Sequence, residues 1–142
     1  MTDVDSAPVD FELLRTVHSR LHNTERFQAV ELRPNYAPNS VFLCYDLGYF
    51  PQEVEDAFLQ VRWYMNDDFN LHYEERYTDG DVWKCRWDRH PNEHNAREHF
   101  HPPPDASKPG KDTAFSEDWR DVISYVLEEI DEHIEGFWRN YD

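Results

Sequence analysis

Histidine and arginine side chains concentrate in residues 86–102 of the chain. Four of the eight histidines and three arginines lie in this stretch: His90, His94, His99, His101, Arg86, Arg89 and Arg97. These residue types suit cleavage of RNA at the 2′-hydroxyl, which needs a base, an acid and a cation beside the phosphate. Histidine can act as base or acid because its pKa lies near neutrality, and the planar guanidinium of arginine stabilises a pentacoordinate phosphate. Tyr73 and Phe100 are candidates for stacking on a base.

Two other interpretations of this cluster remain open. One is a site for Zn or Mn, and its candidate ligands are His90, His94, His99, His101 and Glu98, although their spacing matches no specific template. The other is a set of solvated loop histidines beside the prolines Pro102–Pro104. Acid–base cleavage of RNA needs no metal, so the interpretation of the cluster as an RNA-cleaving site predicts no cofactor.

The chain as a whole is strongly acidic. Its 142 residues include 30 acidic and 14 basic side chains, for a formal net charge of −16, and only three of the basic residues are lysines. Molar salt shortens the Debye length to roughly 3 Å and removes the self-repulsion of such a charge. Because acids run along the whole chain, this composition favours the salt-rich cytoplasm of a halophilic archaeon over an acidic protein with a basic partner. The global charge then reflects the solvent and does not exclude RNA as a partner.

The sequence gives no sign of export or of a membrane segment. Residues 1–8 carry acids and no apolar run, which is typical of a flexible acidic tail and not of a signal peptide. No stretch approaches the ~20 apolar residues of a membrane span. Cys44 and Cys85 lie in apolar, strand-like runs and are predicted to be buried free thiols. We therefore expect a cytoplasmic protein that does not contact a membrane.

The elements that must position the cluster are two helices and about five strands. Apolar periodicity predicts a helix from Asp10 to near Asn23 and a long C-terminal helix capped by Ser116. The predicted strands are residues 26–33, 40–47, 57–65, 70–77 and 82–90. Short links favour a mostly antiparallel sheet, so we predict an α+β fold in one domain, residues 1–142, with both helices packed on the sheet. Residues 91–115 are predicted to form a long loop rich in His and Pro.

The clearest strand pair flanks Asp79-Gly80, a strong hairpin signal. One face of this hairpin is apolar and carries Leu71, Tyr73, Trp83, Cys85 and Trp87. The other face is a mixed-charge surface and carries His72, Glu74, Arg76, Lys84, Arg86 and Asp88. The second strand of the hairpin leads directly into the His-rich segment.

Part of the chain, roughly residues 70–135, resembles the TumE-like family of toxins. The matching features are Tyr73 to Tyr77, the Asp79-Gly80 turn, Arg86-Trp87-Asp88, His90, His99-Phe100-His101 and the final helix. The family pattern is a YRYHY-like strand, a hairpin, an RYDNAPHH segment, a PHHKH segment and a helix. Two departures stand out, because Arg89 replaces the Asn of the pattern and the Pro and Lys of PHHKH are missing.

This resemblance implies the toxin component of a toxin–antitoxin pair, neutralised by an antitoxin protein and acting on RNA. We predict catalytic roles for His99 and His101 as acid and base, with His90 beside them. Arg86 is predicted to bind phosphate, and Asp88 to orient a His or an Arg. The predicted substrate-binding residues are Arg97, Tyr73 and Arg89.

Functions of other classes also remain open at this point. The sheet face and the loop could form a non-catalytic module that binds a protein partner, or the chain could be a metal-binding protein of a halophile. A homodimer is compatible with each of these functions.

Overall fold

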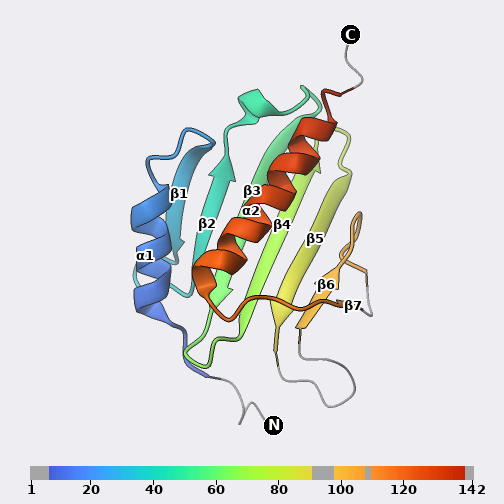
Figure 1. Ribbon diagram of the computed structural model, residues 1–142. Helices are drawn as coiled ribbons and strands as arrows, with labels where there is room; N and C mark the ends of the chain where they lie inside the picture. The colour runs from blue at the N-terminus through green and yellow to red at the C-terminus, as the bar shows by residue number, and fades with distance from the viewer. Residues whose placement is uncertain (1–6, 91–97, 108–109, 140–142) are drawn as a thin grey trace.

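The structure, a computed structural model, describes residues 7–90, 98–107 and 110–139, and within them seven strands form one antiparallel sheet with two helices packed against it (Figure 1). In chain order the elements are α1 (Phe11–Leu21), β1 (Phe27–Arg33), β2 (Ser40–Tyr45), η1 (Leu47–Tyr49), β3 (Val54–Trp63), β4 (Phe69–Tyr77), β5 (Val82–Arg89), β6 (Glu98–His101), β7 (Lys111–Asp112) and α2 (Trp119–Gly136). The strands lie in the sheet in chain order, each antiparallel to the next. The predicted tail falls almost entirely outside the described residues.

The α+β prediction with an antiparallel sheet is confirmed, but about five strands is too few. The additional strands, β6 and β7, lie inside residues 91–115, which the sequence predicts to be a loop. β6 has four residues and β7 has two, so neither is long enough for a period of two to stand out. They form because the outer edge of β5 presents backbone groups that need partners.

Two element boundaries also differ from the prediction. Strand β3 begins at Val54 instead of residue 57, with an irregularity in its pairing to β4 between Val54 and Asp56. Helix α2 is capped by Asp118, whose carboxylate accepts the N–H of Arg120 at 2.9 Å. Ser116 instead accepts the N–H of Asp118 at 3.0 Å, so it stabilises the turn that precedes the helix.

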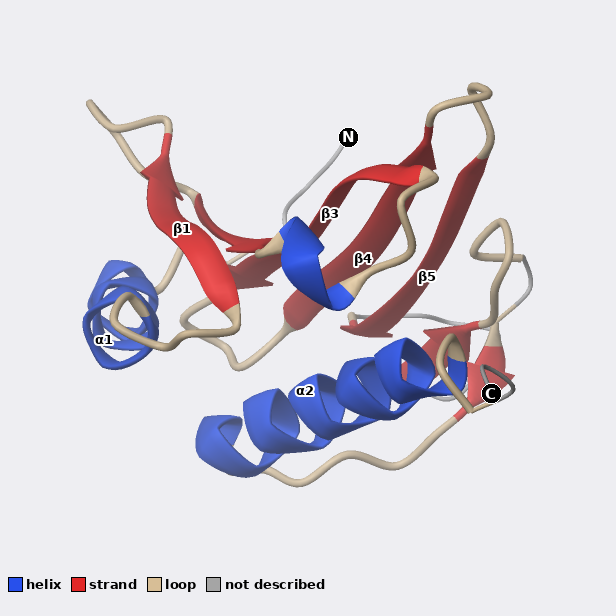
Figure 2. Cartoon of the chain, turned by 90° about the horizontal axis from the view of Figure 1, so that it is seen from above, coloured by secondary structure: helices blue, strands red, loops and turns tan. Residues whose placement is uncertain are grey.

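Both helices cover the same face of the sheet (Figure 2). The apolar stripe of α2 packs against the central strands, and its buried residues are Val122, Ile123, Val126, Ile130 and Ile134. Helix α1 contributes Leu13, Leu14 and Val17 to the same core. The strands supply the alternate residues that face the helices, among them Leu43, Leu59, Trp63, Leu71 and Tyr73. Burial of this one face is the main favourable contribution to folding.

The other face of the sheet carries the remaining alternate residues, and no helix of the described residues covers it. The two cysteines show the division, since Cys85 is buried on the helix face while Cys44 is only partly buried on the uncovered face. Both thiols are free, as predicted, but the prediction that Cys44 is buried is wrong. Burial raises the pKa of the Cys85 thiol to about 12, and that of the Cys44 thiol is raised as well.

We predict that Cys85 resists alkylation in the native protein at pH 8. The reactive species is the thiolate, and both burial under α2 and the raised pKa keep its concentration low. Mass spectrometry after iodoacetamide treatment should show Cys85 labelled only after denaturation, with Cys44 labelled first. Rapid native labelling of Cys85 would contradict the packing of α2 over β5.

Candidate functional site

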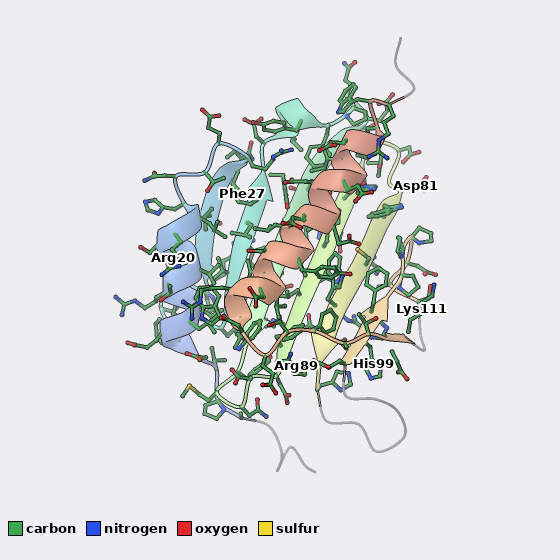
Figure 3. The ribbon with its side chains drawn as sticks, viewed as in Figure 1. Arg20, Phe27, Asp81, Arg89, His99 and Lys111 are labelled. Atoms are coloured by element: carbon green, nitrogen blue, oxygen red, sulfur yellow. The ribbon has the colours of Figure 1, made fainter. Side chains whose placement is uncertain are left out.

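His99 and His101 lie on β6 and point to the uncovered face of the sheet. Strand β6 pairs with β5 so that His99 stands opposite Asp88, and His101 stands opposite Arg86. Residues paired in this way project to the same face, since alternate side chains of a strand point to opposite sides. Figure 3 shows His99 and Lys111 on the neighbouring strands β6 and β7. The short strand that the sequence did not predict is therefore the element that assembles the predicted residues.

Asp88 is the centre of the cluster. It is 2% exposed, yet three groups that can carry positive charge surround its carboxylate. Arg86 Nε donates to Oδ2 at 3.2 Å, and His101 Nε2 lies 3.1 Å from the same oxygen. His90 Nε2 lies 3.5 Å from Oδ1. A carboxylate in this position can fix the orientation of imidazole and guanidinium groups together.

His101 has a polar contact at each ring nitrogen. Nδ1 lies 3.0 Å from the carbonyl oxygen of Ser107, which can only accept, so this nitrogen donates. Nε2 lies 3.1 Å from Oδ2 of Asp88, without hydrogen-bond geometry. Gly110 lies over the ring, where an added Cβ would be 2.8 Å from Cε1 of His101. Because glycine has no side chain, the backbone at Gly110 can approach the ring of His101 this closely.

His99 is buried between two other imidazoles. Its ring centre is 5.5 Å from that of His90 and 6.1 Å from that of His101. Nδ1 lies 3.5 Å from Asp112 Oδ1, and neither ring nitrogen forms a hydrogen bond within the described part of the chain. Asp88 Oδ1 and His101 Nε2 lack hydrogen bonds of good geometry among the same residues. Buried polar atoms without partners are rare and cost about 1–3 kcal/mol each.

The structure brings together five of the predicted residues, Arg86, Asp88, His90, His99 and His101. It does not bring Tyr73 or Arg89 to this cluster, because both point to the helix face of the sheet. Arg97 and His94 lie outside the described residues.

Tyr73 and Arg89 have structural partners on the helix face. The hydroxyl of Tyr73 donates to Glu75 at 2.6 Å, and burial raises the pKa of this phenol far above its usual range. Arg89 donates to Glu98 at 2.8 Å and to the carbonyl oxygens of Asp67 and Ser116 at 3.1 and 2.7 Å. It therefore ties β5 to β6, to the turn before β4 and to the segment before α2.

A second polar group, absent from the sequence-based predictions, lies under α2. Glu75 is 0% exposed and accepts hydrogen bonds from Tyr73, from Tyr77 at 2.8 Å, and from His133 on α2 at 2.7 Å. The ring of His133 stacks on Trp83 with centres 4.0 Å apart. The available signal was Glu75 itself, a charged residue at a position that alternation assigns to the apolar face. This group joins α2 to β4 and lies on the opposite side of the sheet from Asp88.

The structure excludes one of the candidate ligands of the predicted metal site, Glu98. Glu98 points to the helix face and holds Arg89, so it cannot join His99 and His101. Among the residues that the structure describes, no three His, Cys, Asp or Glu side chains are grouped so as to hold a metal ion.

A comparison with known families identifies the chain that carries this polar site. The model of the family described as Toxin TumE matches residues 12–134. The chain therefore belongs to the TumE toxin family, and membership of a toxin family implies, in general, an antitoxin partner. No match was found among curated proteins or among solved structures. No helix in the described ranges is long and apolar enough to cross a membrane.

We predict that Arg89→Met destabilises the protein by about 2–3 kcal/mol, because it leaves Glu98 and two carbonyl oxygens without their charged donor. Urea unfolding followed by circular dichroism measures the change. Arg62→Met, on an exposed strand position, is the control and should change stability by less than about 0.5 kcal/mol. A stable Arg89→Met variant that has lost toxicity would instead indicate a substrate-binding role.

Proposed function

We propose that this chain is the toxin of a toxin–antitoxin pair and that it cleaves RNA without a metal ion. The observation that carries the proposal is the buried Asp88 with Arg86, His90 and His101 around it and His99 alongside. These groups supply the base, the acid and the cation that attack by a 2′-hydroxyl requires.

In this proposal His99 is the base and His101 the acid. His99 removes the 2′-hydroxyl proton, the oxygen attacks phosphorus, and the bond from phosphorus to the 5′-oxygen breaks. His101 donates a proton to the departing 5′-oxygen from Nε2, since Nδ1 faces the carbonyl oxygen of Ser107. The products are a 2′,3′-cyclic phosphate and a free 5′-hydroxyl, so no oxidant or co-reactant is needed.

Arg86 and His90 are the groups that meet the phosphate. The guanidinium of Arg86 is held by Asp88, and its planar fork suits the extra negative charge of the pentacoordinate phosphate. The side chain of His90 is 46% exposed, so it lies at the entrance of the cluster. His99 and His101 are buried in the free chain, and RNA must displace Gly110 to reach His101.

The cellular setting is part of the same proposal. An acid-rich, lysine-poor chain of net charge −16 suits a cytoplasm of high salt, where an antitoxin protein would hold the toxin inactive. High salt also weakens contacts to phosphates, so positioning by fixed side chains matters more than long-range attraction.

We predict that His99→Gln and His101→Gln each reduce RNA cleavage by at least about 100-fold, because each removes a proton-transfer group. Inducible expression in a halophilic host, with growth and RNA integrity followed over time, measures the effect. The control is His22→Gln, an exposed histidine at the end of α1. Unchanged circular dichroism spectra should accompany the loss. Full toxicity in both variants would refute the assigned roles, and a wild-type chain without toxicity would favour a non-catalytic binding module.

We also predict that RNA cleavage by the purified wild-type protein survives an excess of EDTA. Neither proton transfer nor charge stabilisation in the proposed site uses a metal ion. Gel analysis of the cut RNA should also show 2′,3′-cyclic phosphate ends. Loss of activity in EDTA, restored by Zn or Mn, would support the metal interpretation of the histidines.

A further inference from the structure

Two phenylalanines stand among the polar side chains of the uncovered sheet face. Phe42 lies on β2 and Phe58 on β3, and their ring centres are 5.5 Å apart. An arginine covers each ring: Cζ of Arg33 is 4.1 Å from the centre of Phe42, and Cζ of Arg76 is 5.3 Å from the centre of Phe58. We call Phe42, Phe58, Arg33 and Arg76 the capped phenylalanine pair.

An acid on the same strand holds each arginine in place. Arg33 donates to Glu31 at 2.6 and 2.9 Å, and Arg76 donates to Glu74 at 2.7 Å. The two arginine side chains are 47% and 53% exposed. A guanidinium group fixed over a ring and half exposed to solvent is a surface on which a nucleobase stacks. The same arrangement occurs twice on neighbouring strands.

Cross-strand pairing connects this pair to the proposed catalytic cluster. One row of paired residues crosses the sheet from β6 to β2 and consists of His101, Arg86, His72, Gln60 and Phe42. Four spacings between strands separate its ends, roughly 19 Å at about 4.8 Å each. A short single strand of RNA with a phosphate at Arg86 therefore reaches Phe42 while it stays on the sheet.

The distribution of charge also favours a polyanion at this face. Among the paired strand residues, this face carries five basic and five acidic side chains: Arg33, Arg62, Arg76, Lys84, Arg86, Glu31, Asp56, Glu74, Asp88 and Asp112. Nine basic and 25 acidic side chains lie elsewhere in the sequence, so they account for the entire formal charge of −16. RNA thus meets the least repulsion at the uncovered face.

We propose that the capped phenylalanine pair is a stacking subsite for bases of single-stranded RNA, away from the bond that is cut. The proposal rests on the proposed function for RNA as the ligand, and it specifies that the substrate is single-stranded. Bases of a duplex are already stacked on one another and cannot use the pair, whereas unpaired bases can.

The test is the affinity of a labelled single-stranded oligoribonucleotide of about 10 residues, measured by fluorescence anisotropy. Binding is measured in the His101→Gln background, where the proposed chemistry is blocked, and in about 1 M KCl, where phosphate contacts are weakened. Phe42→Leu and Arg33→Ala should each raise Kd roughly 10-fold or more, as loss of one stacking surface does. Phe58→Leu and Arg76→Ala should act alike. A duplex of the same length should bind more weakly.

The chain offers a matched control on α1. Phe11 is exposed there, and Cζ of Arg15 lies 5.9 Å from the centre of its ring. Phe11→Leu and Arg15→Ala should leave Kd unchanged. Because Phe58 is nearly buried, Arg76→Ala is the variant that tests its site without touching the packing.

The outcomes separate this subsite from the nuclease. A wild-type chain that cuts RNA, with Kd unchanged in all four variants, overturns the subsite alone. A chain that leaves RNA intact, but binds it and loses affinity with Phe42→Leu, supports the subsite and contradicts the nuclease. A third outcome is a chain that binds no RNA and forms a dimer in light scattering, which Phe42→Leu converts to a monomer. This outcome overturns the subsite and indicates that the uncovered face is an interface between two copies of the chain.

Discussion

The pairing of β6 with β5 is the contact on which the site depends. A slip of one residue would turn His99 and His101 to the helix face and expose Phe100 in their place. Contacts on the helix face fix the register, because Trp87 packs against Phe100 with ring centres 5.4 Å apart and Arg89 binds Glu98 at 2.8 Å. Packing on one side of a four-residue strand thus sets the geometry of the imidazoles on the other.

The uneven coverage of the sheet explains how an acidic chain keeps a cluster of cationic groups. The helices bury one face, so most polar residues of the strands lie on the other face, together with most of their basic side chains. Acidic side chains occupy the exposed side of α2, including Glu128, Glu129 and Glu132. The molecule therefore presents its negative charge to solvent and ions, and a nearly neutral face to a ligand.

Alternation and turn chemistry made much of the fold predictable. The Asp79-Gly80 hairpin, the stripe of α2 and the shared face of Arg86 and Asp88 all follow from patterns of at least eight residues. His99 and His101 were expected to act together, and they do share a face. Strand β6, which carries them, was not expected, because four residues are too few for a period of two to stand out. The anchoring of Arg89 likewise uses carbonyl oxygens of Asp67 and Ser116, and no local pattern encodes such contacts.

Stability alone does not account for the Asp88 cluster. Charged groups lose hydration on burial, and a buried pair such as Asp88 and His101 regains that loss only when hydrogen bonds satisfy all of its polar atoms. Here Asp88 Oδ1 and both nitrogens of His99 have no hydrogen-bond partner among the described residues. Apolar residues of similar volume would fill the same space at lower cost. By contrast, the buried acid Glu75 on the helix face accepts hydrogen bonds from three donors. The contrast between these two acids on opposite faces supports the proposal that the Asp88 cluster meets a ligand.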